Sequence, residues 1–147
     1  MKNDLLPEIS SDLLAKNCSE LEFESVKKYI KEFELDDRML KQREFLTISD
    51  ESGLVGFGRL REYGAFWELC SLGVVKPKRA KGFGKKLSKA LIEKTTQPIY
   101  LVCVIPSFFM KFGFSICTDF PEEIREKLNY CINQLSVEEQ YVVMKKN

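Results

Sequence analysis

The sequence predicts an α/β fold in which a mixed β-sheet is flanked by helices. Apolar runs of strand length alternate along the chain with amphipathic stretches of helical period. Turns containing glycine, proline and charged residues separate these segments. The run from Ile99 to Ile105 is apolar throughout, as expected of a central strand covered on both faces. Because 147 residues contain no repeat or linker, we expect a single domain over residues 1–147.

The first half of the chain predicts one capped helix and three strands. Residues 1–18 indicate only a short strand or an irregular lead-in. Ser19 and Glu22 form a capping box, in which the serine hydroxyl caps a helix and the glutamate reaches back. Apolar residues at helical spacing extend this helix to about Glu34, namely Leu21, Val26, Ile30 and Phe33. A charged connection over 36–42 leads to strands over 44–49, 54–61 and 66–75, joined by turns at 50–53 and 62–64.

The second half predicts three helices that alternate with three strands. A helix over 85–94 should bury Leu87, Ala90 and Leu91. A later helix begins at Pro121, which suits a first helical position, and has acidic residues in its first turn. The predicted buried stripe of that helix is Ile124, Leu128, Cys131, Ile132 and Leu135. The other elements are strands over 99–105, 114–117 and 141–144 and a short helix over 106–112.

Composition excludes several classes of function. The net charge is +1 and no apolar run of 18 residues occurs, so we expect neither a nucleic acid nor a membrane as partner. Histidine is absent, which excludes histidine-based triads and most catalytic zinc sites, and we expect no metal. The five cysteines are widely spaced without a CxxC pair, which indicates reduced thiols and a cytoplasmic protein. Cys70 and Cys103, with apolar neighbours, are expected in the core.

A glycine-containing turn stands between the strand over 66–75 and the next helix, with the sequence Arg79-Ala80-Lys81-Gly82-Phe83-Gly84. Free backbone N–H groups and the positive end of the helix dipole converge at such a helix N-terminus, which favours phosphate. No acidic residue lies between Glu68 and Glu93, whereas lysines are frequent there. The turn therefore predicts a site for a phosphate-bearing cofactor; the alternative is a tight turn before a solvated helix face.

Two motifs carry a family resemblance. Arg79, Gly82 and Gly84 match the pattern Arg/Gln-x-x-Gly-x-Gly/Ala, and residues Phe109 to Phe114 match aromatic-x-Lys-x-Gly-Phe after the next strand. In both, the chain resembles the GNAT acyl-CoA N-acyltransferase family, most firmly over residues 43–118. The resemblance implies the GNAT fold and acetyl-CoA as cofactor. Lys76 stands where the family frequently has a proline, while Pro77 follows it.

The resemblance also implies which residues would bind coenzyme A. Backbone groups of Val74 and Val75 would meet the pantetheine arm where their strand and the strand over 99–105 splay apart. The glycine turn would wrap the pyrophosphate, because glycines let backbone N–H groups approach without a Cβ in the way. The implied set is Val74, Val75, Arg79, Ala80, Lys81, Gly82, Phe83, Gly84, Lys85 and Phe109.

Glu68 is the candidate general base. It lies six residues before Val74 in an apolar strand, where several members of the family place a base. A base is needed because an ammonium must lose a proton before it can attack a thioester. The alternative is a structural glutamate that pairs with Arg59 or Arg61 on the neighbouring strand.

The proton donor that many members of the family use is missing. They have a tyrosine where this chain has Phe109, so Tyr100, Tyr141, a cysteine or water would protonate the departing thiolate. Alternatively the thiolate leaves without a dedicated acid, because a thiol pKa of about 8.5 already makes it a fair leaving group. Catalysis would then depend on positioning and on polarisation of the thioester carbonyl by a backbone N–H near Val74.

Two arginines bear on the acceptor. Arg59 and Arg61 share one face of their strand and could hold the carboxylate of an amino acid or another acidic amine. Surface pairing with Glu62 or Glu44 is the alternative. The C-terminal pattern resembles acyltransferases related to N-acetylglutamate synthase through Pro121, Ile124, Cys131, Val142 and Met144.

We therefore expect an acetyl-CoA-dependent N-acetyltransferase that acetylates the primary amine of a small molecule, as a monomer or a homodimer. A catalytically inactive coenzyme A-binding sensor of the same fold is the alternative, because Phe109 replaces the tyrosine. A nucleic-acid binder using the lysines over 76–89 is a third and weaker hypothesis, because the whole chain is nearly neutral.

Overall fold

The computed structural model describes residues 13–135 and 137–147, so the expectation for residues 1–12 lies outside the described chain. Within these residues a mixed sheet of seven strands has the order β1-β2-β3-β4-β5-β7-β6, which confirms the predicted α/β fold. In chain order the elements are β1 (Lys16–Asn17), α2 (Glu20–Glu32), η1 (Gln42–Glu44), β2 (Phe45–Asp50), β3 (Gly53–Glu62), β4 (Trp67–Val74), η2 (Lys76–Lys78), α3 (Phe83–Ile92), β5 (Ile99–Cys103), α4 (Pro106–Met110), β6 (Ser115–Ile116), α5 (Glu122–Gln134) and β7 (Val142–Lys146).

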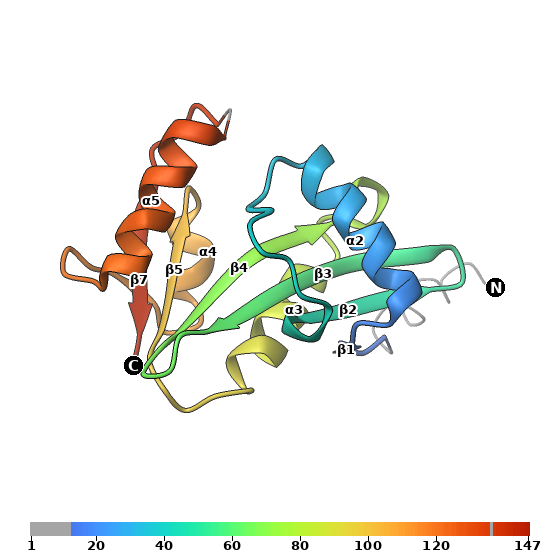
Figure 1. Ribbon diagram of the computed structural model, residues 1–147. Helices are drawn as coiled ribbons and strands as arrows, with labels where there is room; N and C mark the ends of the chain where they lie inside the picture. Colours follow the sequence, from blue (N-terminus) through green and yellow to red (C-terminus); the bar gives the residue numbers. More distant parts are fainter. Residues whose placement is uncertain (1–12, 136) are drawn as a thin grey trace.

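The sheet has helices on both faces (Figure 1). Side chains alternate between the faces along each strand. On β5, Leu101 joins a core with residues of α3 and α4, whereas Tyr100 packs with Ile124 of α5. On β2, Phe45 packs beneath α2. One face of the sheet is therefore covered by α3 and α4, and the other by α2 and α5.

Strands β4 and β5 pair over a short distance and then separate. They run parallel to each other, and their paired residues are Trp67 with Ile99 and Glu68 with Tyr100. Beyond these two pairs β4 continues to Val74 without a β5 partner, and Figure 1 shows the two strands diverging into a V. The splay that the resemblance implied is therefore present, and it leaves backbone groups of β4 facing a gap.

A β-bulge lies in the free part of β4. Phe57 of β3 pairs with Gly73 and Arg59 pairs with Cys70, so β4 has one residue more than β3 between these pairs. Ser71 lies in this stretch with φ of 52°, in the left-handed region. Its hydroxyl donates a hydrogen bond of 2.9 Å to the carbonyl of Asp36, which ties the bulge to the connection after α2.

Two apolar residues of the predicted helices, Leu21 and Ile132, are exposed. The capping box of Ser19 and Glu22 is confirmed, but Leu21 is 82% exposed, because it lies about 140° around the helix from buried Val26. Ile132 is 58% exposed, because the buried stripe of α5 passes through Lys127 rather than through Ile132. The burial predicted for Ile132 is thus wrong, whereas Leu21 lies in the helix that its spacing predicted.

Some element ends are also shifted. Pro121 is the N-cap of α5 rather than its first helical residue. Strand β5 ends at Cys103 rather than at residue 105, because Ile105 already serves as the N-cap of α4. The helix predicted over 85–94 begins two residues earlier, at Phe83, and buries Leu87 as expected.

Candidate functional site

The end of β4 presents one backbone amide to the gap beside β5. The N–H of Val75 donates to the carbonyl of Val55 on β3 at 2.9 Å. Because backbone groups alternate in direction along a strand, the N–H and C=O of Val74 point away from β3 and toward the gap. Of the two residues expected to meet a pantetheine arm, Val74 therefore has its amide directed there, whereas the amide of Val75 is already used.

The glycine turn forms a helix N-terminus without a side-chain cap. Ala80 and Gly82 have φ of 64° and 87°, and Gly82 is the N-cap of α3. The amide of Lys86 donates to the Gly82 carbonyl at 3.1 Å, so the amides of residues 83–85 precede the helical hydrogen bonds. A Cβ at residue 82 would meet no protein atom within 4 Å, so the described protein leaves the space over this turn open.

Close packing brings this turn against the end of β4. A Cβ at residue 84 would lie 3.6 Å from Cζ of Phe108 and 4.0 Å from Cγ2 of Val74. The start of α3, the end of β4 and α4 thus meet at one place. Backbone N–H groups from two elements lie there together, as a site for a diphosphate and its attached chain requires.

Arg79 supports the backbone of this site. Its Nε donates to the carbonyl of Val74 at 2.8 Å, and its guanidinium lies 4.9 Å from the centre of the Phe33 ring on the segment that follows α2. Lys81 and Lys85 are exposed beside the turn. Two other lysines are engaged elsewhere, because Lys78 pairs with Asp50 at 2.8 Å and Lys86 donates to the carbonyl of Leu13.

The two phenylalanines of the expected cofactor set are core residues. Phe83 and Phe109 are 2% and 5% exposed. The Phe109 ring packs edge-on against Phe108, with 4.9 Å between centroids. Their side chains shape the wall behind the turn, so a direct contribution from Phe83 to a ligand can come only through its backbone.

On the other face of the sheet lies a group of six mostly buried polar residues, which we call the charged cluster: Asp36, Arg38, Arg61, Tyr63, Glu68 and Lys127. Glu68 is fully buried, and Nζ of Lys127 lies 2.6 Å from its Oε2. The same ammonium lies 3.0 Å from Oδ2 of Asp36. Lys127 belongs to α5, so it links this helix to β4 and to the connection after α2.

The partners of Asp36 and Lys127 decide the charge state of both groups. Burial acts to raise the pKa of Asp36, but hydrogen bonds from Arg38 and the charge of Lys127 outweigh it and hold that pKa well below its usual range. Burial acts to lower the pKa of Lys127, but Glu68 and Asp36 raise it well above the ordinary value. Both side chains are therefore charged at neutral pH.

Arg59 and Arg61 hold the connection after α2 against the sheet. Their Nη2 atoms donate to the carbonyl of Arg38 at 2.6 and 2.5 Å. Arg59 is fully buried with its Nε 3.2 Å from Glu44, and Nη1 of Arg61 lies 3.7 Å from Oε1 of Glu68. The expected pairing of Arg59 with Glu44 is present, but it lies in the interior rather than at the surface.

The groups considered as proton donors differ in their surroundings. Tyr100 is 7% exposed and packs among apolar residues of α5 and β7. Cys70 and Cys103 are buried, as expected of core residues, and burial raises the pKa of both thiols. Tyr141 is half-buried at the start of the last segment, and burial raises its pKa too. Within the described residues, none of these four groups forms a hydrogen bond with the glycine turn.

The charged cluster contains residues that the sequence reasoning missed. The burial of Lys127 could have been predicted from the sequence, because it lies three residues after Ile124 and four before Cys131, within the buried stripe of α5. A lysine at such a position must find a buried partner. Asp36, Arg38 and Tyr63 lie in a connection and at a strand end, where no periodicity marks them.

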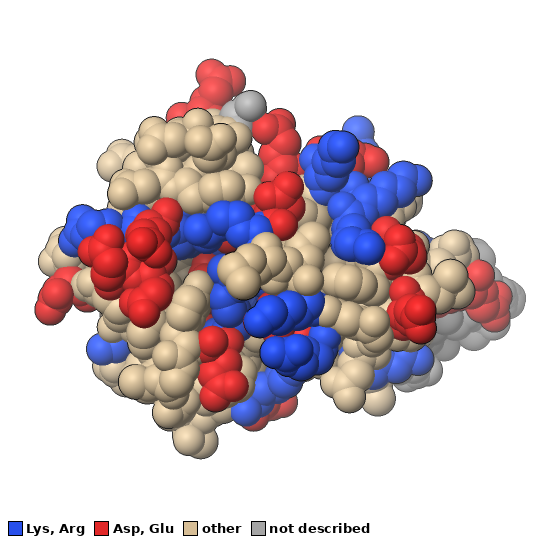
Figure 2. Space-filling model, in the orientation of Figure 1, with Lys and Arg blue, Asp and Glu red and all other residues tan. Residues whose placement is uncertain are grey.

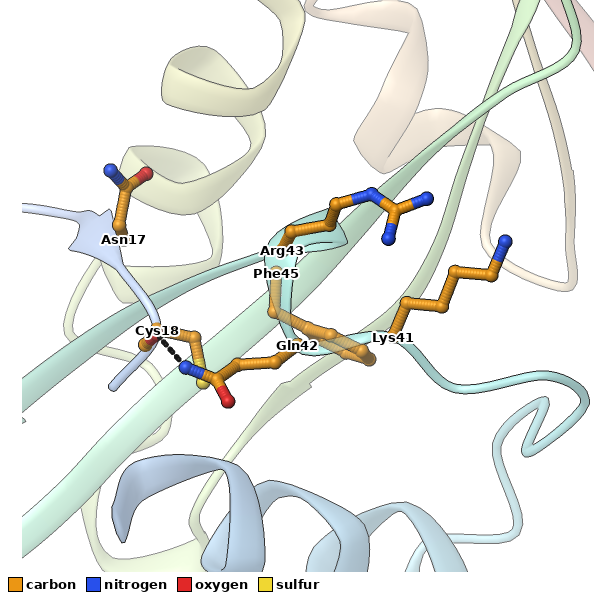
Figure 3. A pocket seen from close by; sticks show the side chains of 6 residues that line it. All are labelled: Asn17, Cys18, Lys41, Gln42, Arg43 and Phe45. Carbon is orange, nitrogen blue, oxygen red and sulfur yellow. Dashed lines mark hydrogen bonds between the residues drawn. The ribbon is translucent and has the colours of Figure 1, made fainter. Parts of the chain in front are cut away.

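A cavity of about 660 Å³ lies apart from both sites. Gln42 donates to the carbonyl of Cys18 at 3.0 Å, and Figure 3 shows Lys41 and Arg43 extending away from Cys18. None of the residues predicted for cofactor or acceptor lines it. On the face shown in Figure 2, Lys and Arg side chains gather between α5 and α2.

No group of three or more metal-ligating side chains gathers within residues 13–135 and 137–147. No helix in that part of the chain is both long and apolar enough to cross a membrane.

The model of the acetyltransferase (GNAT) domain matches residues 14–119 of this chain. The chain therefore belongs to the GNAT acetyltransferase family. No curated protein matches the sequence.

Solved structures agree with this fold. N-acetylglutamate synthase from Neisseria gonorrhoeae, complexed with coenzyme A and N-acetyl-glutamate, is similar with a TM-score of 0.72 and 14% identity over 91% of this chain. This chain spans 34% of that protein's length. Rv2747 from Mycobacterium tuberculosis, in complex with CoA and NLQ, has a TM-score of 0.74 and 13% identity over 90% of this chain and 98% of its own. Escherichia coli ElaA has a TM-score of 0.66 and 14% identity over 92% and 99%.

Proposed function

We propose that this protein transfers the acetyl group of acetyl-CoA to the primary amine of a small molecule, by direct attack of the amine on the thioester. The observation that carries this proposal is that a hydrogen-bond donor for the cofactor and a candidate general base lie on the same strand, β4. The amide of Val74 faces the β4–β5 gap beside the N-terminus of α3. Glu68 lies six residues earlier on the same strand, where β4 and β5 are still paired. A donor held from the α3 side and an amine arriving from the α5 side would meet at this strand.

The cofactor would be held mainly by backbone. The amides of residues 83–85 and the open space above Gly82 fit a diphosphate, and exposed Lys81 and Lys85 add positive charge. The amide of Val74 would contact the pantetheine arm or polarise the thioester carbonyl. Arg79 would act by fixing the carbonyl of Val74, with Ala80 supplying the turn. Val75, whose amide is bonded to Val55, and Phe109, which is buried, would support the site by packing rather than by bonding the cofactor.

Glu68 would accept the proton that the acceptor ammonium must lose. Acetyl-CoA supplies the thioester, whose carbonyl carbon the free amine attacks. The thiolate would leave without a dedicated acid, because Phe109 has no proton to give and the Tyr100 ring is buried among apolar groups. A thiol pKa of about 8.5 makes that departure feasible.

The acceptor would be an amino acid or another acidic amine. Arg61 is the better candidate for holding its carboxylate, because its side chain is 11% exposed whereas that of Arg59 is 0% exposed. The likeness to N-acetylglutamate synthase, solved with N-acetyl-glutamate, supports this class. We propose a cytoplasmic monomer or homodimer that acts as one domain, and the five free cysteines agree with a reducing compartment.

An acetylation screen tests this function. The full chain is incubated with acetyl-CoA and a panel of amines that includes amino acids, polyamines and aminoglycosides, and release of free coenzyme A is recorded. We expect turnover with an acidic amine, and Glu68→Gln should lower kcat about 100-fold or more and move the pH profile. Turnover restricted to basic amines would contradict the acceptor class, and an unaltered pH profile in Glu68→Gln would return Glu68 to a structural role.

A coenzyme A-binding sensor is the second candidate, and Phe109 is the observation that favours it. Calorimetry separates the two, because a sensor binds coenzyme A yet releases none from acetyl-CoA with any amine of the panel.

A further inference from the structure

Glu68 cannot be reached directly by an acceptor in this conformation. Its side chain is fully buried, although the role proposed for it requires a proton from outside. The groups around it come from four elements. Arg61 comes from β3 and Tyr63 directly follows that strand. Asp36 and Arg38 come from the connection after α2, Glu44 from η1 and Lys127 from α5. Two nearby thiols, Cys70 and Cys131, have pKa values raised by burial, so they stay neutral.

The two carboxylate oxygens of Glu68 have different partners. Oε2 is held at 2.6 Å by the ammonium of Lys127. Oε1 accepts a hydrogen bond of 3.2 Å from the hydroxyl of Tyr63 and lies 3.7 Å from Nη1 of Arg61. The strong ion pair occupies one oxygen, so a proton arriving at Glu68 would go to Oε1, the oxygen that faces Tyr63.

Tyr63 is placed to carry such a proton. It is half-buried, whereas Glu68 has no exposed surface, and its ring stacks on Phe66 with 5.0 Å between centroids. Its oxygen accepts from Nη1 of Arg61 at 3.1 Å and donates to Glu68. A phenol oxygen has two lone pairs, so one remains for a further donor. Burial and the charge of Glu68 raise the pKa of Tyr63, so the phenol keeps its proton at neutral pH.

We propose that Tyr63 relays the proton of the acceptor ammonium to Oε1 of Glu68. The N–H bond of the ammonium breaks as the Tyr63 oxygen takes that proton, directly or through one water. The original O–H proton of Tyr63 passes to Glu68. The products are a neutral amine, a neutral Glu68 carboxyl and an unchanged tyrosine, so the proton count balances. This relay rests on the proposed role of Glu68 as base.

The test compares two tyrosine variants that each lose one hydroxyl, one within the charged cluster and one beside it. Tyr63→Phe removes the oxygen bonded to Glu68. Tyr130→Phe, the control, removes an oxygen that donates to Asp37 at 2.9 Å and has no bond to Glu68. For both variants and Glu68→Gln, kcat/KM for the best acceptor of the screen is measured from pH 6 to pH 10, together with KM for acetyl-CoA and a circular dichroism check of folding.

We expect Tyr63→Phe to lower kcat/KM about 10–100-fold at neutral pH and to move the midpoint of the pH profile up, towards the pKa of the acceptor amine itself. Glu68→Gln should shift it in the same direction, and Tyr130→Phe should leave it unchanged. A wild-type profile in Tyr63→Phe, with a shifted one in Glu68→Gln, would overturn the relay and leave Glu68 as base. Wild-type profiles in both would overturn the relay together with the base.

Discussion

The glycine turn over residues 79–84 and the charged cluster lie on opposite faces of the same sheet and are built in opposite ways. The glycine turn uses main-chain amides at an open surface, with φ of 87° at Gly82. The charged cluster uses long side chains in the interior, where Lys127 lies between two carboxylates. The first depends on backbone shape and tolerates many side chains. The second depends on side-chain charge, because each buried charge needs its partner.

Removing Lys127 should have the largest effect on stability. Lys127→Met leaves Asp36 and Glu68 without their shared cation, and breaking a buried ion pair costs about 3–5 kcal/mol. Denaturant unfolding measures this loss. Lys89→Met, at an exposed position of α3, is the control and should unfold like the wild type. Equal stability of the two variants would mean that the charged cluster does not hold the fold together.

Asp36 should make stability depend on pH. Its pKa in the folded protein lies below the ordinary value of about 4, so its pairing stabilises the fold above that pH and the contribution is lost as the pH falls. Asp36→Asn should cost about 2 kcal/mol at pH 7, the worth of a hydrogen bond to a charged group. Denaturant unfolding from pH 3 to pH 8 should show this difference shrink towards pH 3. A difference that stays constant with pH would contradict the assignment.

Gly82 and Gly64 form a matched pair of positions with which the role of the glycine turn can be tested. Both have positive φ, 87° and 94°, and a Cβ at either would meet no protein atom within 4 Å. Gly82→Ala and Gly64→Ala should each lose about 1 kcal/mol, because a side chain is strained in the left-handed region. Only Gly82→Ala should weaken coenzyme A binding, by tenfold or more in calorimetry. Equal affinities of the two variants for coenzyme A would contradict a role of the glycine turn in binding the cofactor.

Much of the glycine turn was predictable from the sequence, because its determinants are local. Arg79, Gly82 and Gly84 lie within six residues, and a strand before and a helix after them define the geometry. The bonding of the Val75 amide to Val55 was not predictable, since it depends on the register between β3 and β4.

The charged cluster was largely invisible in the sequence, because its members come together only through tertiary packing. Asp36 and Lys127 are 91 positions apart in the printed sequence and 3.0 Å apart in space. The buried stripe predicted for α5 was partly wrong for the same reason, since Lys127 occupies a buried position of this helix while Ile132 is exposed. Glu68 was identified only through the resemblance and its apolar strand, and neither revealed its partners.

Amide hydrogen exchange, measured residue by residue with and without coenzyme A, tests most directly whether the cofactor is held by the backbone at the end of β4 and the start of α3. We predict slowed exchange at Val74 and at residues 83–85, with no change at Gln42 and Arg43 beside the separate cavity. Binding that leaves those four amides unchanged, or that protects residues 41–43 instead, would contradict this site.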